Sequence, residues 1–389
     1  MYVLITRVLD PLLAHALKLA WRVALVLKSR SCNVNSVGRL ALLCGLLLCA
    51  VSAQAATKYW IGGTAGDFND NSRWSTTSGG ANDTTAPGST DVATFDGSGL
   101  GSATITTNLD VDGINILAGY TGTLTQNSGV TLTVGASAFN QAGGIFVGSN
   151  ATIDVNDSFT LSGGAFTSTS GSLFIARHFT LSGGTFTHNS GTIVINGIVD
   201  QNITSGGNSF NHLVLNNTGP AFQDDIIIAD ALDINGDLTI TSGWLDLDSN
   251  NPAVNTAGNV TVQTNGFVYV GARTANWTFD GTSILTDSSS GGTQDLQDVV
   301  VNGTSLTLAS NAKVETLTVT SGTLNLGGSG YVLEIDGTGT PLSNSGTFTA
   351  GTSTVKYTGT GSATNSPRCL TAVCGSPRLR LRPIRSLDT

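Results

Sequence analysis

Apolar and polar residues alternate one by one in short segments through much of this chain. Phe159 and Leu161, for example, are separated by Thr160 and followed by Ser162. Such a period of two predicts β-strands, in which every second side chain faces the core. The segments end at Gly-Gly, Ser-Gly or Asn-Gly pairs, which supply the positive φ angles that tight turns need. The chain is therefore predicted to be all-β.

Three consecutive blocks of twenty residues align without a gap: Ala138–Asp157, Ser158–Arg177 and His178–Gly197. A fixed period near twenty is typical of stacked-repeat architectures. A meander sandwich would give the same local pattern, but the in-phase repeat favours a coil of parallel strands with one turn per block. The residues that align are Phe139, Phe159 and Phe179; Phe146, Phe166 and Phe186; and the glycine pairs at 143–144, 163–164 and 183–184. We expect the phenylalanines to stack into interior ladders.

The rest of the middle region continues this pattern less regularly. We predict that residues 101–366 form the β-solenoid repeats and that residues 56–100 form an amino-terminal cap segment. At about twenty residues per rung and about 4.8 Å between rungs, the region from Gly101 to Gly361 would contain roughly thirteen rungs.

The segment before the cap has the pattern of a secretory signal peptide. Within residues 37–55, Arg39 precedes an apolar run from Leu40 to Val51, and the sequence Ala53-Gln54-Ala55 follows it. This is a basic region, an apolar region and a small-residue cleavage site. We interpret residues 1–36 as an over-extended amino terminus.

The carboxyl-terminal residues 367–389 depart from the middle in composition, because they carry five Arg and three Pro. We interpret this basic tail as the result of a frameshift or truncation. The alternatives are a basic anchoring segment and a small disulfide loop between Cys369 and Cys374.

The net charge of the middle region excludes some classes of binding partner. Residues 56–366 hold six basic and 24 acidic residues, a net charge of −18. Such a surface repels nucleic acid and anionic lipid, so we expect no nucleic-acid partner. Acidity also keeps a Thr-rich β-solenoid soluble and discourages edge-to-edge pairing. All five Cys lie outside this region, so burial and backbone ladders, not disulfides, are expected to hold the core.

Residues with catalytic potential are sparse. Glu315 and Glu334 are the only Glu in the chain, and most Asp residues stand in turn sequences, where a carboxylate usually caps a nearby N–H group. The alternative is calcium, which prefers oxygen ligands clustered on loops. The best cluster for it is Asp246, Asp248, Asn250 and Asn251. No other cofactor is expected.

Two tryptophans, Trp60 and Trp74, stand close together in the cap segment. We predict that they close the exposed end of the first rung. The alternative is a glycan-binding platform on which a pyranose ring stacks, and Trp244 and Trp277 are further candidates for such contacts.

The cap and the repeats together resemble secreted bacterial surface proteins built from β-strand repeats, namely autotransporter-associated β-strand repeat proteins and related adhesins. The resemblance covers roughly Lys58–Gly361. It rests on six stretches: Tyr59–Gly63 (YWIGG), Arg73–Gly80 (RWSTTSGG), Asp91–Gly97 (DVATFDG), Phe179–Phe186 (FTLSGGTF), Ser209–Asn217 (SFNHLVLNN) and Phe348–Gly361 (FTAGTSTVKYTGTG). The resemblance implies a right-handed parallel β-helix that displays surfaces for adhesion.

We therefore expect a secreted, non-catalytic protein of the bacterial cell surface with a structural or adhesive role. Its expected partners are extracellular glycans or other cell-surface proteins, and after signal cleavage it is not expected to be an integral membrane protein. The alternative is a polysaccharide-binding or polysaccharide-degrading β-helix protein. Lyases of this fold use carboxylates with calcium and a basic residue, which only Lys58, Arg73, Arg177, Arg273, Lys313 and Lys356 could supply.

Overall fold

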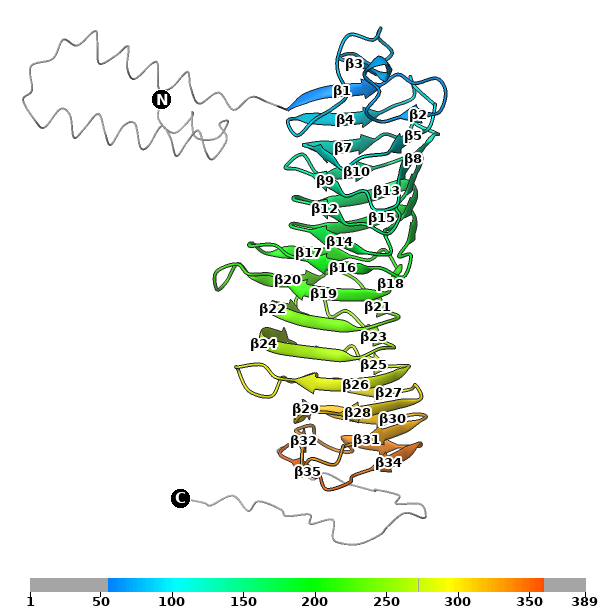
Figure 1. Cartoon of the computed structure of the whole chain (residues 1–389). Coiled ribbons are helices and arrows are strands. Elements are labelled where there is room, and N and C mark those ends of the chain that lie inside the picture. Colours follow the sequence, from blue (N-terminus) through cyan, green and yellow to red (C-terminus); the bar gives the residue numbers. More distant parts are fainter. Residues whose placement is uncertain (1–54, 272, 360–389) are drawn as a thin grey trace, which may run out of the picture. The chain divides into compact units, whose positions relative to one another are not determined.

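The structure, a computed structural model, describes residues 55–271 and 273–359. The predictions for residues 1–36, for residues 37–54 of the signal peptide, for residues 360–366 of the repeats and for the tail 367–389 lie outside the described residues. Within the described ranges the fold is a parallel β-solenoid of about twelve turns, stacked from β1 to β35 (Figure 1). The prediction of an all-β parallel β-helix is confirmed.

Each turn of the solenoid contributes strands to three faces. The first face contains β1 (Ala56–Trp60), β4 (Asp91–Phe95), β7 (Gly113–Ile116), β10 (Phe139–Gln141), β17 (Gln201–Thr204), β20 (Asp225–Ile228), β29 (Ala312–Val314), β32 (Val332–Ile335) and β35 (Thr354–Tyr357). The second face contains β2 (Gly66–Asp67), β5 (Ala103–Ile105), β8 (Thr123–Gln126), β11 (Ile145–Val147), β18 (Ser209–Phe210), β21 (Leu232–Ile234), β23 (Val254–Thr256), β25 (Trp277–Phe279), β27 (Asp298–Val301), β30 (Thr316–Val319) and β33 (Leu342–Asn344). The third face contains β6 (Leu109–Val111), β9 (Leu132–Val134), β12 (Ile153–Val155), β14 (Ser172–Ile175), β16 (Thr192–Ile195), β19 (His212–Asn216), β26 (Thr282–Asp287), β28 (Ser305–Leu308), β31 (Thr323–Asn325) and β34 (Thr347–Thr349).

Four long strands bend round a corner and belong to two faces. β13 (Phe159–Thr167) and β15 (Phe179–Thr187) join the first face to the second, and β22 (Leu238–Asp246) and β24 (Val260–Tyr269) join the third face to the first. A short strand, β3 (Trp74–Ser75), and the 3-10 helix η1 (Asn71–Arg73) lie in the segment between β1 and β4.

The length of a turn varies although the strands stay in register. Phe159 pairs with Phe179, twenty residues later, but Leu238 pairs with Val260 after 22 residues and Val260 with Leu285 after 25. The corner loops absorb these differences, which is why the described chain makes fewer turns than a uniform period predicts. The parallel stack also starts at β1, inside the segment expected to be a separate cap, because β1 pairs with β4 and β4 with β7.

The core is built from ladders of like residues, as predicted for the phenylalanines. The rings of Phe139, Phe159 and Phe179 stack at 5.2 Å, with planes 17° and 11° apart. A second ladder, Phe146, Phe166 and Phe186, is nearly parallel within itself and meets the first edge to face, with 4.7 Å between the centroids of Phe159 and Phe166. The aromatic residues of the three blocks thus fill one continuous column.

Glycine is required where β13 and β15 turn the corner. Gly164 has a φ of +75°, and Gly184, one turn later, has a φ of +74°. A Cβ added at Gly164 would clash with the carbonyl oxygens of Gly143 and Gly144 in the preceding turn. The aligned glycine pairs therefore let consecutive corners approach each other at the spacing of the strands.

Buried glutamines satisfy backbone groups at other corners, a role that the sequence did not reveal. Gln201 is fully buried, accepts a hydrogen bond from the Gly197 amide at 3.0 Å and donates to the carbonyls of Ile175 and Arg177 at 3.2 and 2.8 Å. Because an unpaired buried carbonyl costs free energy, these side chains replace strand hydrogen bonds where the chain leaves the ladder.

The phenylalanine ladder generates a prediction for stability. Phe159→Ala should lower the free energy of unfolding by about 3–5 kcal/mol, because it removes a completely buried ring that two neighbouring turns contact. Thr160→Ala, on the outward side of the same strand, should cost less than about 0.5 kcal/mol. Urea unfolding followed by circular dichroism measures both changes, and equally small effects would show that Phe159 is not a core residue.

The glycine corner of β13 generates a second prediction for stability. Two glycines allow the cost of a steric clash to be distinguished from the cost of backbone strain. Gly129 has nearly the same φ as Gly164, +74°, but an added Cβ there meets nothing within 4 Å. Gly129→Ala should therefore cost only the strain of a left-handed residue, about 1–2 kcal/mol. Gly164→Ala should cost clearly more in the same unfolding experiment. Equal costs would mean that the corners do not pack as closely as described.

Candidate functional site

The first candidate site is the aromatic cluster at the amino-terminal end of the solenoid. Trp60 from β1 and Trp74 from β3 are completely buried, and their rings meet edge to face at 5.3 Å. Phe68 lies 4.9 Å from Trp74, and Phe95 from β4 lies 5.8 Å from Trp60. Both indole N–H groups are paired, since Trp60 donates to the Gly101 carbonyl at 2.8 Å and Trp74 to the Phe68 carbonyl at 2.7 Å.

The strand that carries Trp74 covers the end of one edge of β1. β3 pairs with β1 in antiparallel orientation, with Tyr59 opposite Ser75 and Trp60 opposite Trp74. The other edge of β1 pairs with β4 in parallel, like the strand pairs of the later turns in the described residues. An unpaired strand edge is a template for association with other chains, so β3 protects the end of the stack.

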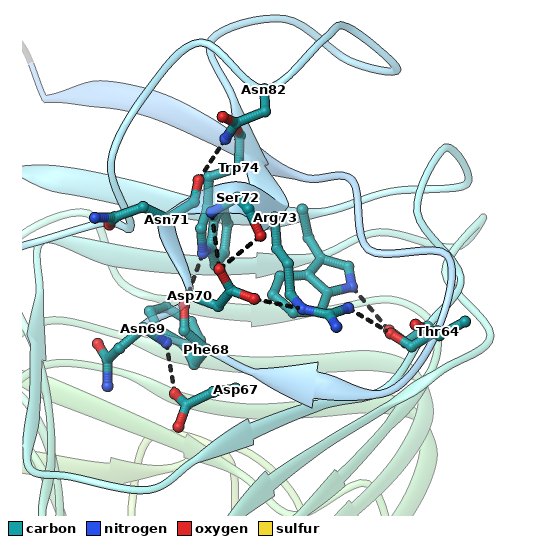
Figure 2. Close-up of polar contacts among 12 residues, drawn as sticks. Thr64, Asp67, Phe68, Asn69, Asp70, Asn71, Ser72, Arg73, Trp74 and Asn82 are labelled. Atoms are coloured by element: carbon teal, nitrogen blue, oxygen red, sulfur yellow. Dashed lines mark hydrogen bonds and ion pairs between the residues drawn. The ribbon is translucent and has the colours of Figure 1, made fainter.

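A polar network holds the segment between β1 and β3 in place (Figure 2). Asp70 accepts hydrogen bonds from the Ser72 amide at 2.9 Å and the Ser72 hydroxyl at 2.6 Å, and Arg73 contacts its other oxygen at 3.1 Å. The hydrogen bonds from Ser72 are the main reason why the pKa of Asp70 lies below its usual value. Arg73 also donates to the Thr64 carbonyl at 2.8 Å, and its guanidinium lies 5.7 Å from the Trp60 ring centroid.

This geometry assigns Trp60 and Trp74 to the closure of the solenoid end. The alternative of a glycan platform requires an exposed ring face, and neither ring offers one because both are buried within the cap. Trp277 is also fully buried, so among the tryptophans of the described residues only Trp244 is exposed.

The four residues of the calcium hypothesis lie in and after the end of β22, where most of them make loop contacts. The carboxylate of Asp246 accepts hydrogen bonds from the amides of Asp248 and Ser249 at 2.8 and 3.1 Å and from the Ser249 hydroxyl at 2.6 Å. Asn250 donates to the Ile228 carbonyl at 3.1 Å, and Asn251 accepts from the Thr274 and Ala275 amides. The geometry supports the turn-forming interpretation of Asp246, and calcium binding by this group stays a prediction. Within the described residues no group of three or more His, Cys, Asp or Glu is placed to hold a metal ion.

The basic residues considered for a lyase do not converge. Five of the six form ion pairs with nearby carboxylates, whereas Arg273 is buried and donates to the carbonyls of Pro252 and Asn276. The ion pairs are Lys58–Asp91, Arg73–Asp70, Arg177–Asp157, Lys313 with Asp295 and Asp336, and Lys356–Glu334. Four of these cations therefore tie neighbouring turns together, whereas the Arg73–Asp70 pair lies within the segment between β1 and β3.

The second candidate site is an outward-facing group of aromatic residues on the first face, Trp244, Phe267 and Tyr269, which we call the aromatic strip. Trp244 is paired in register with Phe267 in the next turn, and their rings stack at 4.7 Å with planes 21° apart. Tyr269 meets Trp244 at 6.5 Å in an edge-to-face arrangement. Trp244 is 37% and Tyr269 47% exposed.

The sequence carries a signal for the aromatic strip that the prediction of Trp60 and Trp74 as glycan contacts did not include. Leu245 and Leu247 are the buried positions of one alternating segment, and Val268 and Val270 are those of the next. Trp244, Phe267 and Tyr269 therefore occupy positions where the alternation expects polar residues. An aromatic residue at an outward position indicates a surface with a function more strongly than one at an inward position.

Two loops bracket the aromatic strip. β22 and β24 bend round the corner between the third and first faces without a loop. In the solenoid turns before and after them, this corner carries the loops 217–224 and 288–294, which project from the stack beside β20 and β26 (Figure 1). The amide of Trp244 donates to the Asp224 carbonyl at 3.0 Å at one end. At the other end, Gln294 accepts from the Val268 amide at 2.9 Å.

The surroundings of the aromatic strip are acidic. Asp225 is paired in register with Trp244, and Asp246 with Tyr269. Partial burial raises the pKa of Asp225, and repulsion by the carboxylates of Asp200, Asp246 and Asp224 raises it further. The site thus combines exposed aromatic rings with clustered carboxylates.

The raised pKa of Asp225 generates a prediction. A carboxyl group with a higher pKa in the folded state binds its proton more tightly there, so its contribution to stability is lost as the pH rises from the unfolded value, about 3.9, through the folded value. Asp225→Asn should therefore raise the melting temperature at pH 7 and have little effect near pH 3. Asp70→Asn should have the opposite sign at pH 7, because the pKa of Asp70 is lowered. Thermal melts at both pH values check this, and a loss of stability in Asp225→Asn at pH 7 would contradict it.

Comparison with family models, with curated proteins and with solved structures finds no match to this chain. In the described residues, no helix has the length and apolar character needed to cross a membrane. The site must therefore be interpreted from its own chemistry.

Proposed function

We propose that the protein is a secreted protein of the bacterial cell surface with a structural or adhesive role. The observation that carries the proposal is a continuous solenoid that is closed at its amino-terminal end by β3 and the buried tryptophan pair. Such a stack presents long rows of outward side chains at fixed spacing, which suits contact with an extended partner. The resemblance to bacterial β-strand-repeat proteins supports the same role.

The charge of the solenoid is compatible with the proposed role, because it favours a soluble, unaggregated protein. The acidic excess of residues 56–366 is distributed over many turns, and most of their few cations are already paired with carboxylates. Like charges on neighbouring copies repel each other, which opposes aggregation of a Thr-rich β-protein.

The alternative of a polysaccharide-degrading enzyme has less support, because the basic residues that it would use are engaged in ion pairs or hydrogen bonds within the stack. Polysaccharide binding without catalysis is favoured by one observation, the exposed aromatic strip.

An experiment on intact cells tests the proposed location. Antibodies against the solenoid should label intact bacteria that express the full chain, or detect the protein in their culture medium. Labelling that appears only after the cells are permeabilised, with no protein in the medium, would contradict the proposal.

A prediction for processing accompanies the proposal. We expect the exported protein to begin at Ala56, directly after the Ala53-Gln54-Ala55 sequence. Strand β1 starts at the same residue, so cleavage there would leave the first turn intact. Mass spectrometry of the amino-terminal peptide measures the site, and exported protein that retained residues 37–54 would refute it.

A further inference from the structure

We propose that the aromatic strip binds an uncharged polysaccharide chain, an inference that rests on the proposed extracellular function and gives it a ligand class and a site. Trp244 and Phe267 form a stack that runs from one turn to the next, and Tyr269 widens it on one side. Exposed aromatic rings bind flat apolar surfaces, and the C–H faces of sugar rings are such surfaces.

The outward rows of the first face show that the aromatic strip is a local exception. In the rows that contain the strip, most of the preceding positions are polar: Asp225 precedes Trp244, and Asn202, Ile227 and Asp246 precede Tyr269. Exposing the large rings of Trp244 and Tyr269 to water is unfavourable unless a partner covers them. The three aromatic residues are neighbours although they come from two different turns, which makes them a contiguous surface.

A peptide strand is a poor occupant of this surface. Peptides commonly bind β-structures by adding a strand to a free edge. Here β22 pairs with β20 on one side and β24 on the other, so its backbone groups are already used. At β24, which pairs with β22, the Val268 amide is taken by the Gln294 side chain. Recognition must therefore occur through side chains that point outward.

Charge selects among polysaccharides. Asp225 and Asp246 flank the strip; partial burial is the main reason why the pKa of Asp225 is raised, and repulsion by the nearby carboxylates adds to it. An anionic polysaccharide would add to that repulsion, whereas an uncharged one would not. Asp225, which is less buried than Asp246, can also accept a hydrogen bond from a sugar hydroxyl group.

The loop 217–224 supplies a further contact. Phe222 is 93% exposed and has a φ of +69°, an unfavourable conformation for a non-glycine residue. The end of its loop meets the strip, since the Asp224 carbonyl accepts the Trp244 amide. We expect a bound chain to lie across Trp244 and to reach the Phe222 loop.

Affinity electrophoresis of the full chain tests the proposal. Native gels would contain dextran, laminarin, galactomannan or xyloglucan as uncharged probes and alginate as an anionic probe. We expect at least one uncharged probe to retard the protein and alginate to have no effect. Trp244→Ala and Tyr269→Ala should each weaken binding by about tenfold or more, as for an aromatic residue at the centre of an interface.

Ile145→Ala is the matched control, because Ile145 is 42% exposed on β11, away from the strip. It should leave retardation unchanged, and circular dichroism should show that all variants stay folded. In solution, the retarding probe should protect the wild type from acrylamide quenching, and the protected fraction should be missing in Trp244→Ala. Trp60, Trp74 and Trp277 are buried and contribute little to that difference.

Three results would overturn the proposal: retardation by none of the four uncharged probes, equal retardation of wild type and Trp244→Ala, or protection from quenching by polylysine instead of a polysaccharide. The last result would identify the strip as a site for basic peptides. None of these results bears on the location of the protein. If the protein is exposed on the cell surface but binds no probe, only this inference is wrong. If it binds a polysaccharide but is confined inside cells, only the proposed function is wrong.

Discussion

The spacing between turns is the constraint on which the structure depends. Parallel hydrogen bonds hold successive strands about 4.8 Å apart, so each residue lies directly over its counterpart in the next turn. Two phenylalanines can stack at this distance, as Phe159 and Phe179 do, and two glycines can pass at a corner. A residue of the wrong size disturbs the packing of the turns on both sides. The repetition in the sequence therefore follows from geometry.

The same constraint explains how much of the fold could be predicted from the sequence. The alternation around Phe159 and the twenty-residue period are local signals, and they identified the inward residues and the parallel stack correctly. The longer turns after Gly197 were less clear, because a corner loop can grow without changing the register of the strands. Strand β3 could not be predicted at all, since Trp74 and Ser75 carry no alternation and pair with β1 only through long-range contacts.

The roles of the candidate sites could be predicted only in part, because they also depend on packing between residues that are distant in the sequence. Proximity of Trp60 and Trp74 in the sequence indicated a shared role, but only their packing distinguished a buried plug from an exposed platform. Asp246 was conspicuous as a ligand for calcium, yet a carboxylate that follows a strand can equally accept the amides of its own loop. The aromatic strip depends on residues from two turns that lie 23 positions apart, Trp244 and Phe267. Their adjacency required the register, which no local pattern supplies.

The covered edge of β1 gives the assembly of the solenoid a direction. β3 blocks one edge of β1 at Tyr59 and Trp60, whereas the other edge pairs with β4 along most of its length. Growth of the parallel stack from the aromatic cluster therefore runs towards later turns, each of which is a template for the next. Synthesis of a polypeptide runs in the same order, so β1 is made before the turns that stack on it.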